Sequence, residues 1–299
     1  MTATSRPFMG EPDIMCINQF LLDTYQITQW LYNWEPRRWL GNIHHRPLDE
    51  MHAYIQDVLP KQVHIWEQDG QIIGVVHPED AGSVFLEIHP HHREIEPEML
   101  AWAEANLTTP SGELTIWCYE DDAVRQSVLA AAGYVRGTYH DNLRQCDVQA
   151  IDIPAYPLPE GFTVRTMTTD QQDLEQFAVM LNKAFNRNSH TAAEYVSFQA
   201  SAIYDADLDI VVTNPAGEIV CTAGFTHTIF GLVEPVCTVP AYEGMGLAKA
   251  AIAEGLRRLQ ARGVAVAFIG ASGTNPVSNH VYEKLGFVNF KRHYAWHRG

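Results

Sequence analysis

The sequence of 299 residues predicts an α/β protein made of two similar units. Three observations lead to this. Strand and helix patterns alternate over residues 162–296, much of the same order recurs more weakly in the first half, and a segment with three prolines in eleven residues separates the halves. A repeat of about 150 residues is too long for a solenoid and indicates a duplicated domain. We therefore expect domains over 1–150 and 162–299, joined by a proline-rich linker over 151–161.

The second half shows clear periodicity. Leu174, Phe177, Leu181 and Phe185 have helical spacing, and a turn ending in Gly217 separates two strand-like runs. A later helix ends in arginines and is followed by Gly263. Cations interact favourably with the C-terminal end of a helix dipole, and glycine is preferred just after a helix end. The expected strands cover 162–166, 209–213, 218–227, 232–239, 264–269 and 287–296, and the expected helices cover 169–185, 192–203, 246–262 and 276–285.

The first half repeats part of this order. A hairpin around Asp69 and Gly70 is followed by a strand, a helix, a strand and a helix that ends at Gly133. The expected strands cover 63–66, 72–76, 84–88 and 114–119, and the expected helices cover 98–107 and 123–132.

Composition narrows the function classes. The formal net charge is −16, and the first 150 residues alone contribute −13, from 9 basic and 22 acidic residues. This balance disfavours nucleic acids and anionic membranes as partners and suits cationic small molecules. The five cysteines have no CxxC pair, and residues 1–16 lack the apolar stretch of a signal peptide. We therefore expect a cytoplasmic, soluble protein with reduced thiols.

The segment from Glu234 to Ala251 carries the strongest chemical signal. A strand runs into a turn with Gly244 and Gly246 and then directly into a helix. The first N–H groups of such a helix are unpaired and lie at the positive end of its dipole, so they form an anion site that suits a phosphate or pyrophosphate. A plain tight turn is the alternative. Lys249 stands where a dinucleotide-binding turn needs Gly or Ala, and the sequence of a P-loop is absent.

A second motif follows at Asn275, Ser278, Tyr282, Gly286 and Phe287. With it the chain resembles the GNAT superfamily of acyl-CoA-dependent N-acetyltransferases. In that family the turn reads Arg/Gln-x-x-Gly-x-Gly/Ala, matched here by 243–248, and the later motif reads Asn-x-x-Ala-x-x-x-Tyr-x-x-x-Gly-Phe. Both occur in the family's order, and the resemblance covers about 162–296.

The resemblance implies a tandem GNAT fold, with a mixed, mostly antiparallel sheet flanked by helices in each domain, and acetyl-CoA as co-substrate. The strand would bond its backbone to the pantetheine arm, the turn would bind the pyrophosphate, and two asparagines would touch the cofactor. These implied cofactor-binding residues are Val236, Cys237, Thr238, Val239, Gly244, Met245, Gly246, Leu247, Ala248, Lys249, Asn275 and Asn279.

Two residues are candidates for catalysis by direct attack of a neutral amine on the thioester. The resemblance places Tyr282 near the sulfur, where a phenol can donate a proton to the departing thiolate. Glu234 begins the cofactor strand and is the candidate base, alone or through water. The alternatives are a packing role for Tyr282 and an exposed strand-end carboxylate for Glu234.

The sequence departs from the family pattern in two places. Glu243 stands where the family has Arg or Gln, so a carboxylate lies beside the expected pyrophosphate. In the first half, Glu94 and Glu96 fall where the second half has Gly244 and Gly246, and Pro97 removes an amide. By the same alignment Asp122 replaces Asn275 and Leu129 replaces Tyr282. We therefore expect the first domain to be a degenerate copy without a cofactor site.

The leading hypothesis is an acetyl-CoA-dependent N-acetyltransferase that acts on a primary amine of a small cationic molecule. The alternatives are an acyl-CoA-binding sensor or scaffold without turnover, and a protein or peptide N-acetyltransferase. Neighbouring histidines at 89, 91 and 92 are expected to be solvated, so no metal is predicted. Monomer and homodimer both stay open.

Overall fold

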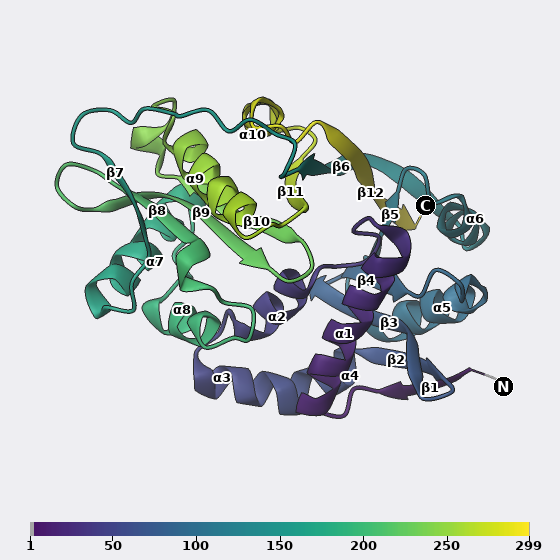
Figure 1. Ribbon diagram of the computed structural model, residues 1–299. Coiled ribbons are helices and arrows are strands. Elements are labelled where there is room, and N and C mark those ends of the chain that lie inside the picture. The colour runs from purple at the N-terminus through teal and green to yellow at the C-terminus, as the bar shows by residue number, and fades with distance from the viewer. Residues whose placement is uncertain (1–2, 299) are drawn as a thin grey trace. The chain divides into compact units, whose positions relative to one another are not determined.

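The computed structural model describes residues 3–298, so only residues 1–2 and 299 of the expected domains lie outside it. The chain forms two compact units, drawn in Figure 1. The first unit comprises Met1–Ile43, Asp49–Asp141 and Lys291–Gly299, and the second comprises His44–Leu48 and Asn142–Phe290. The units therefore divide at 141/142 and again at 290/291, whereas the sequence had suggested one division in the proline-rich segment.

Each unit contains both strands and helices. The order in the first half is β1 Thr4–Pro7, α1 Glu11–Thr28, α2 Pro36–His44, α3 Leu48–Ala53, a π-turn Tyr54–Val58, α4 Leu59–Gln62, β2 His64–Gln68, β3 Gln71–Asp80, β4 Ser83–Ile88, a 3-10 turn Arg93–Ile95, α5 Glu96–Leu107, β5 Thr115–Tyr119, α6 Ala123–Ala131 and β6 Tyr134–Asp147. The order then continues with β7 Thr163–Thr166, α7 Gln171–Phe185, α8 Ala192–Gln199, a 3-10 turn Ala206–Leu208, β8 Asp209–Thr213, β9 Ile219–His227, β10 Gly231–Thr238, a 3-10 turn Pro240–Tyr242, α9 Leu247–Ala261, β11 Val266–Ser272, α10 Pro276–Lys284 and β12 Asn289–Arg298. In residues 3–298 there is no helix with the length and apolar character needed to cross a membrane.

The two units share one sheet topology. The strand order is β1-β2-β3-β4-β5-β12 in the first unit and β6-β11-β10-β9-β8-β7 in the second. In the first unit neighbouring strands pair antiparallel, except for β4 with β5, which is a parallel pair. In the second unit β7, β8, β9 and β10 pair antiparallel with their neighbours in this series, and β10 pairs parallel with β11. The predicted mixed, mostly antiparallel sheet with flanking helices is confirmed, and so is its duplication.

Every predicted strand and helix is present, with ends that differ by a few residues. The hairpin turn after β8 has the expected geometry, because Gly217 has φ 81° and its N–H donates to the Asn214 carbonyl oxygen (2.9 Å). Strands β1 and β6 and helices α1 to α4 were not predicted from the sequence. This region supplies two buried tryptophans to the core. Trp34 lies between α1 and α2, and Trp39 lies in α2.

The last strand of the first unit comes from the far end of the chain. β5 pairs with β12, from Tyr119 with His293 to Thr115 with His297, and not with β6, the strand that directly follows α6. β6 instead neighbours β11 in the second unit. This exchange of final strands is why residues 291–299 cluster with the first unit.

The proline-rich segment 151–161 has no regular secondary structure except a turn at its end. Its half-buried side chains Ile151, Ile153, Tyr156 and Leu158 pack against the core formed by α9 and β8 to β11. The segment is therefore a strap bound to the second unit along its length.

All five cysteines are free thiols, as expected. Cys118, Cys146 and Cys221 are buried, and burial raises the pKa of each thiol, to about 12. These three side chains therefore pack as neutral, apolar groups.

Helix α9 packs against β8, β9 and β10 at very close range. A Cβ on Gly255 would lie 2.0 Å from the Cε2 atom of Phe225, inside the ring's van der Waals radius. Glycine in a helix interior normally costs about 0.5–1 kcal/mol relative to alanine. Here the contact between helix and sheet requires it.

We therefore expect Gly255→Ala to lower the free energy of unfolding by about 2 kcal/mol, because overpacking a full core outweighs the gain in helix propensity. Urea denaturation of the full chain measures this. The double variant Gly255→Ala/Phe225→Leu should recover part of the loss relative to the sum of the single variants. A stabilised Gly255→Ala protein would contradict the packing argument.

Candidate active site

In the second unit, strand β10 is paired with β11 over only part of its length. β10 pairs with β11 at Gly231, Leu232 and Val233, opposite Ala267, Phe268 and Ile269, and the described pairing stops there although both strands continue. Backbone groups of a strand alternate in direction. Val239 donates its N–H to Val220 of the β9 side (2.9 Å), so the backbone groups of Thr238 and Val236 face the side where β11 has separated.

A bulge lies where the strands separate. The β9–β10 register shifts between Val233 and Val236, and the Glu234–Pro235 bond in between is cis. Gly224 faces this bulge, and a Cβ there would lie 2.9 Å from the Glu234 carbonyl oxygen. The glycine lets β9 follow β10 closely at this point.

The turn after β10 leads into an uncapped helix start. Gly244 and Gly246 have φ of 75° and 80°, and Gly246 is the N-cap of α9 with no side-chain hydrogen bond to the helix. A Cβ on either glycine would meet no atom within 4 Å, so open space lies in front of both. The N–H groups at the start of α9 therefore face space that an anion can enter.

The other turn residues predicted to bind the cofactor are placed around this helix start. Met245 is exposed, Leu247 is buried, and Ala248 and Lys249 are half-buried in the first turn of α9. Glu243 is exposed, so its carboxylate can remain in solvent.

Tyr282 lies in α10 and is 5% exposed. Burial raises the pKa of its phenol to about 12, a hydrogen bond with Ser278 lowers it, and the nearby Cys237 and Glu234 raise it further. The phenol is therefore protonated throughout the neutral range. Its electrostatic interaction with these two β10 side chains brings both candidate catalytic residues, Tyr282 and Glu234, into one neighbourhood.

Cys237 faces away from α9. Its Sγ lies 3.5 Å from the Met180 sulfur of α7, and it packs with Val239 against the core between α7 and α8. Burial raises the pKa of the Cys237 thiol. The side chains of Cys237 and Val239 thus belong to one sheet face, whereas Val236 packs on the α9 face.

Asn275 and Asn279 both hold the start of α10. Asn275 is its N-cap and accepts a hydrogen bond from the Ser278 N–H (3.1 Å). The Asn279 amide donates to the carbonyl oxygens of Ser272 (2.8 Å) and Asn275 (2.7 Å). Its oxygen accepts from Asn142 (2.8 Å) and Arg144 (3.1 Å). With all four bonds made, the Asn279 side chain ties β6, β11 and α10 together.

The first unit contains the same separated strand pair, but it is filled. β4 pairs with β5 only at Ser83 and Val84, and beyond that its edge is bonded by side chains. Arg125 donates to the Leu86 carbonyl oxygen (2.6 Å). Asn33 donates to the Ile88 carbonyl oxygen (3.0 Å) and accepts from the Ile88 N–H (2.9 Å). None of the hydrogen bonds seen in residues 3–298 joins a side chain to the backbone of Val236 or Thr238 in this way.

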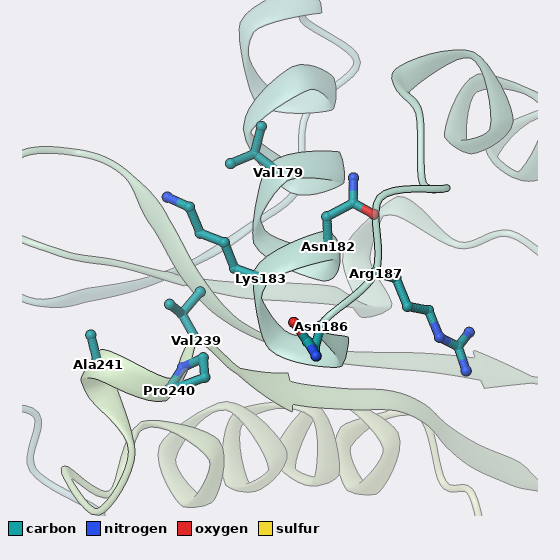
Figure 2. Close-up of a pocket in the computed structure, with 8 residues that line it drawn as sticks. All are labelled: Val179, Asn182, Lys183, Asn186, Arg187, Val239, Pro240 and Ala241. Carbon is teal, nitrogen blue, oxygen red and sulfur yellow. The ribbon is translucent and has the colours of Figure 1, made fainter.

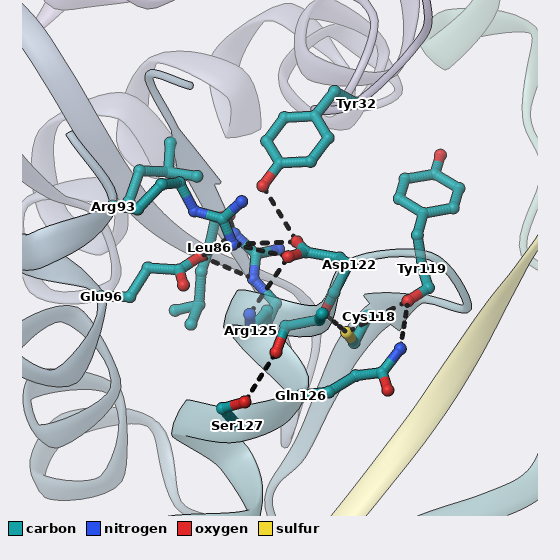
Figure 3. A network of polar contacts seen from close by, with 12 residues as sticks. Tyr32, Leu86, Arg93, Glu96, Cys118, Tyr119, Asp122, Arg125, Gln126 and Ser127 are labelled. Carbon is teal, nitrogen blue, oxygen red and sulfur yellow. Dashed lines mark hydrogen bonds and ion pairs between the residues drawn. The ribbon is translucent and has the colours of Figure 1, made fainter. Parts of the chain in front are cut away.

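A buried ionic network holds Arg125 in this position, as Figure 3 shows. Glu96 is fully buried and accepts hydrogen bonds from Arg125 (Nε, 3.0 Å) and Arg93 (2.8 Å). Asp122 accepts from Arg93 (2.8 Å) and from the hydroxyl of Tyr32 (2.9 Å). Glu96 is thus a counter-ion at the start of α5, where the second unit has the open helix start.

Two of the predicted correspondences between the halves have matching local structure. Asp122 caps α6 through the Arg125 N–H, as Asn275 caps α10 through Ser278. Leu129 and Tyr282 are both buried seven residues after these caps. Arg125 therefore stands where the second unit has Ser278. This correspondence was not predicted, although the alignment of the two caps contains it.

The glycine correspondence needs a correction. The loop from β4 to α5 is 89–95 and the loop from β10 to α9 is 239–246, one residue longer. When the helix starts are aligned, Gly246 corresponds to Ile95, the N-cap of α5, and Glu96 corresponds to Leu247. Ile95 has φ −85°, so the left-handed turn that opens the α9 site is missing in the first unit.

The histidines after β4 contact one another. The His89 ring lies 5.0 Å from that of His92, and His92 lies 3.3 Å from a Glu94 oxygen. Across residues 3–298 no group of three His, Cys, Asp or Glu side chains is placed to hold a metal ion.

Known proteins resemble this chain in sequence and in fold. Residues 174–287 match the model of the acetyltransferase (GNAT) family. The mycothiol acetyltransferase of Salinispora arenicola is 27% identical over 249 residues, which are 77% of this chain and 79% of that protein. That of Streptomyces coelicolor is 27% identical over 234 residues, 73% of this chain and 74% of that protein.

Solved structures share the fold along the whole chain. A tandem GNAT protein from the clavulanic acid biosynthesis pathway superposes with a TM-score of 0.69 at 14% identity, covering 99% of this chain and 98% of that one. A GCN5-related N-acetyltransferase from Sphaerobacter thermophilus gives 0.66 at 17% identity, covering 99% and 95%.

The repeated topology, with a separated parallel strand pair in each unit, defines a tandem-domain acyltransferase fold. Residues 174–287 carry the match to the GNAT family, and together with the relatives and the tandem GNAT structures this match supports an N-acetyltransferase of the GNAT superfamily with two such units.

The buried network predicts how the first unit responds to acid. Burial by itself raises the pKa of Asp122, but Arg125 and Arg93 outweigh it, so this pKa lies below the ordinary value of 3.8. The ionised carboxylate therefore contributes stability above about pH 4, and this contribution is lost as pH falls through the lowered pKa.

We expect Asp122→Asn, which keeps the N-cap, to lower the free energy of unfolding by about 2 kcal/mol at pH 7. The difference from the wild type should shrink as pH falls below about 4. Denaturant titrations at several pH values measure it. Asp121→Asn, which removes an exposed partner of Lys291, is the matched control and should cost under about 0.5 kcal/mol. Equal losses in the two variants would contradict the role of the network.

Proposed function

We propose that the second unit transfers an acetyl group from acetyl-CoA to the primary amine of a small molecule that is cationic at neutral pH. One observation carries this proposal. An edge of β10 with open backbone groups at Val236 and Thr238 leads, through two glycines, into the uncapped start of α9. An extended chain that carries amides and ends in a pyrophosphate matches both parts in order.

The residues fit acetyl-CoA as follows. The backbone groups of Val236 and Thr238 would pair with the pantetheine arm. The N–H groups from Gly246 to Lys249 would bind the pyrophosphate, and the open space before Gly244 and Gly246 admits it. Asn279 would support the cofactor site indirectly, because its four hydrogen bonds already hold the start of α10.

Acetyl-CoA, when bound, supplies the acetyl group as a thioester. Tyr282 would hold a proton at its phenol oxygen and release it to the departing sulfur, a role that its raised pKa and its closeness to β10 support. Open N–H groups on β10 would polarise the acetyl carbonyl. Glu234, which interacts electrostatically with Tyr282, would accept the proton of the amine directly or through water.

The acceptor class rests on charge and on the relatives. The net charge of −16 favours a cationic acceptor over an anionic one at long range. The relatives named mycothiol acetyltransferase act, by that name, on a small molecule, which favours the same class here over a protein substrate. Buried, protonated Tyr282 favours turnover over an acyl-CoA sensor.

The first unit would bind no acetyl-CoA. Arg125 and Asn33 bond the backbone groups of β4 that correspond to those open in β10, and Glu96 lies where a pyrophosphate would approach. Displacing them would uncover a buried carboxylate and a buried guanidinium, which is costly. One active site per chain is therefore the expected arrangement.

We expect titration calorimetry to give one acetyl-CoA per chain, and thiol release from acetyl-CoA when a panel of small primary amines is added. Gly246→Ala should weaken acetyl-CoA binding at least tenfold, because a Cβ enters the anion's space. Gly263→Ala is the matched control: it changes a glycine with φ 75° after the other end of α9 and should leave binding unchanged. Tight binding without thiol release for any amine would favour the sensor, and two molecules per chain would contradict the filled first unit.

Tyr282→Phe should lower kcat at least a hundredfold with little change in the KM for acetyl-CoA, because the proton donor is lost. Since the pKa of Tyr282 is raised to about 12, wild-type activity should not fall between pH 7 and pH 10 for want of this proton. Glu234→Gln should lower kcat/KM and shift its acidic limb, since activity rises as the base loses its proton. Full turnover by Tyr282→Phe, or an unchanged limb at near-normal rate in Glu234→Gln, would remove the respective role.

A further inference from the structure

The turn that joins β10 to α9 has one side chain that is not exposed to solvent. Of the residues from Pro240 to Gly246, only Tyr242 is half-buried, and all the others are exposed. Gly244 and Gly246 add two positions at which the backbone is unusually free to rotate. We call residues 240–246 the cofactor turn. It needs an anchor if it is to hold one conformation before an anion binds.

Open space separates the cofactor turn from α7. A cavity of about 600 Å³ lies between them, with Pro240 and Ala241 on one side and Val179 and Lys183 on the other, as Figure 2 shows. The Tyr242 side chain instead packs against the core on the α9 face of the sheet. The side chain that can fix the cofactor turn relative to the rest of the second unit is therefore that of Tyr242.

Asn214 holds the hydroxyl group of Tyr242. It is buried in the hairpin turn between β8 and β9, and its Nδ2 donates to the Tyr242 hydroxyl oxygen (2.9 Å) and to Glu218 Oε2 (2.7 Å). Its Oδ1 accepts from the N–H groups of Ala216 and Glu218, each at 3.0 Å. Since both amide protons and the oxygen are engaged, the orientation of this amide is fixed, and Tyr242 meets a rigid partner.

Phe162 holds the ring of Tyr242. It is the first residue after the strap, and the two ring centroids lie 6.0 Å apart with an interplanar angle of 71°, an edge-to-face arrangement. The strap end also lies close to the hairpin turn, because a Cβ on Gly161 would lie 2.9 Å from the Cγ atom of Pro215. The strap end, the hairpin turn and the cofactor turn thus meet around Tyr242.

The first unit lacks this arrangement. The His92 N–H donates to the carbonyl oxygen three residues back (3.0 Å), as the Tyr242 N–H does (2.8 Å), so the two residues correspond. The His92 ring instead lies 3.3 Å from Glu94 of its own loop. Within residues 3–298, no hydrogen bond joins His92 to the hairpin turn at Asp69 and Gly70. The anchor is thus found in the unit whose strand edge is open.

We propose that Tyr242 is a positioning residue for acetyl-CoA, which holds the cofactor turn in its binding conformation before the cofactor arrives; this rests on the proposed function. A turn that is already fixed loses less conformational entropy on binding, so affinity rises without any contact between Tyr242 and the cofactor. Asn214 and Phe162 act through Tyr242. Turnover at saturating acetyl-CoA does not depend on the anchor, because the bound cofactor then holds the turn itself.

Tyr242→Phe tests this, because it keeps the ring that contacts Phe162 and removes only the oxygen that Asn214 binds. We expect the Kd and the KM for acetyl-CoA to rise about three- to tenfold, as for the loss of one hydrogen bond, with kcat unchanged. Calorimetry and steady-state kinetics measure these constants. The matched control is Tyr204→Phe, which removes another half-buried phenol hydroxyl of this unit, bonded to Asp209 (3.0 Å). It should leave the affinity for acetyl-CoA unchanged.

Amide hydrogen exchange measures the conformation of the turn directly. In the unliganded chain, the N–H groups of 243–249 should exchange faster in Tyr242→Phe than in the wild type, and saturating acetyl-CoA should remove the difference. Tyr204→Phe should leave exchange in 243–249 unchanged. Asn214→Ala should also raise the Kd for acetyl-CoA, and adding Tyr242→Phe to it should then raise the Kd no further, because the two residues act as one unit.

Wild-type affinity together with wild-type exchange in Tyr242→Phe would overturn the proposal. An equal loss of affinity in Tyr204→Phe, or a fall in kcat without a change in KM in Tyr242→Phe, would do so too. If the wild type binds no acetyl-CoA, the proposed function fails, and exchange in the unliganded chain still tests the anchor. Faster exchange over 243–249 in Tyr242→Phe would then support the anchor, and unchanged exchange would overturn it.

Discussion

A strand that separates from its neighbour must find other partners for its N–H and C=O groups, because buried backbone groups left unpaired are costly. This requirement governs both units. β4 separates from β5 after Val84, and β10 separates from β11 after Val233. The turn that follows each strand, the start of the next helix and the cap of the last helix all surround the resulting gap. Most of what distinguishes the units is the way in which each gap is filled.

Residues at corresponding positions fill the gap in the first unit and leave it open in the second. In the first unit Arg125 reaches the β4 backbone, and the carboxylates of Glu96 and Asp122 compensate its charge and that of Arg93. In the second unit the corresponding residue is Ser278, which is too short to cross the gap and instead interacts with Tyr282. A small number of side chains that differ in charge and length thus bond the strand edge of β4 in one unit and leave the strand edge of β10 without such bonds in the other.

Much of this was predictable from the sequence because short motifs fix local backbone geometry. The turn with Gly244 and Gly246 could be assigned, since few other residues adopt those backbone conformations. Asn275 was expected only to touch the cofactor, and its role as the cap of α10 was not predicted. The filled gap was predicted only as a loss of glycines, because Arg125 and Asn33 meet β4 across large distances in sequence. The exchange of β6 and β12 was not predicted, since strand patterns identify a strand without naming its partner.

The exchange of final strands also sets an order of completion during synthesis. A ribosome releases β6 well before β7 to β11, so every strand of the second sheet is available once β11 has emerged. The first sheet is different, because its edge at β5 is closed by β12, which is made after every strand of the second sheet. The unit that begins the chain is therefore the unit that finishes folding last. Until then the edge of β5 lies open, at the stage when a nascent protein is most exposed to wrong pairing.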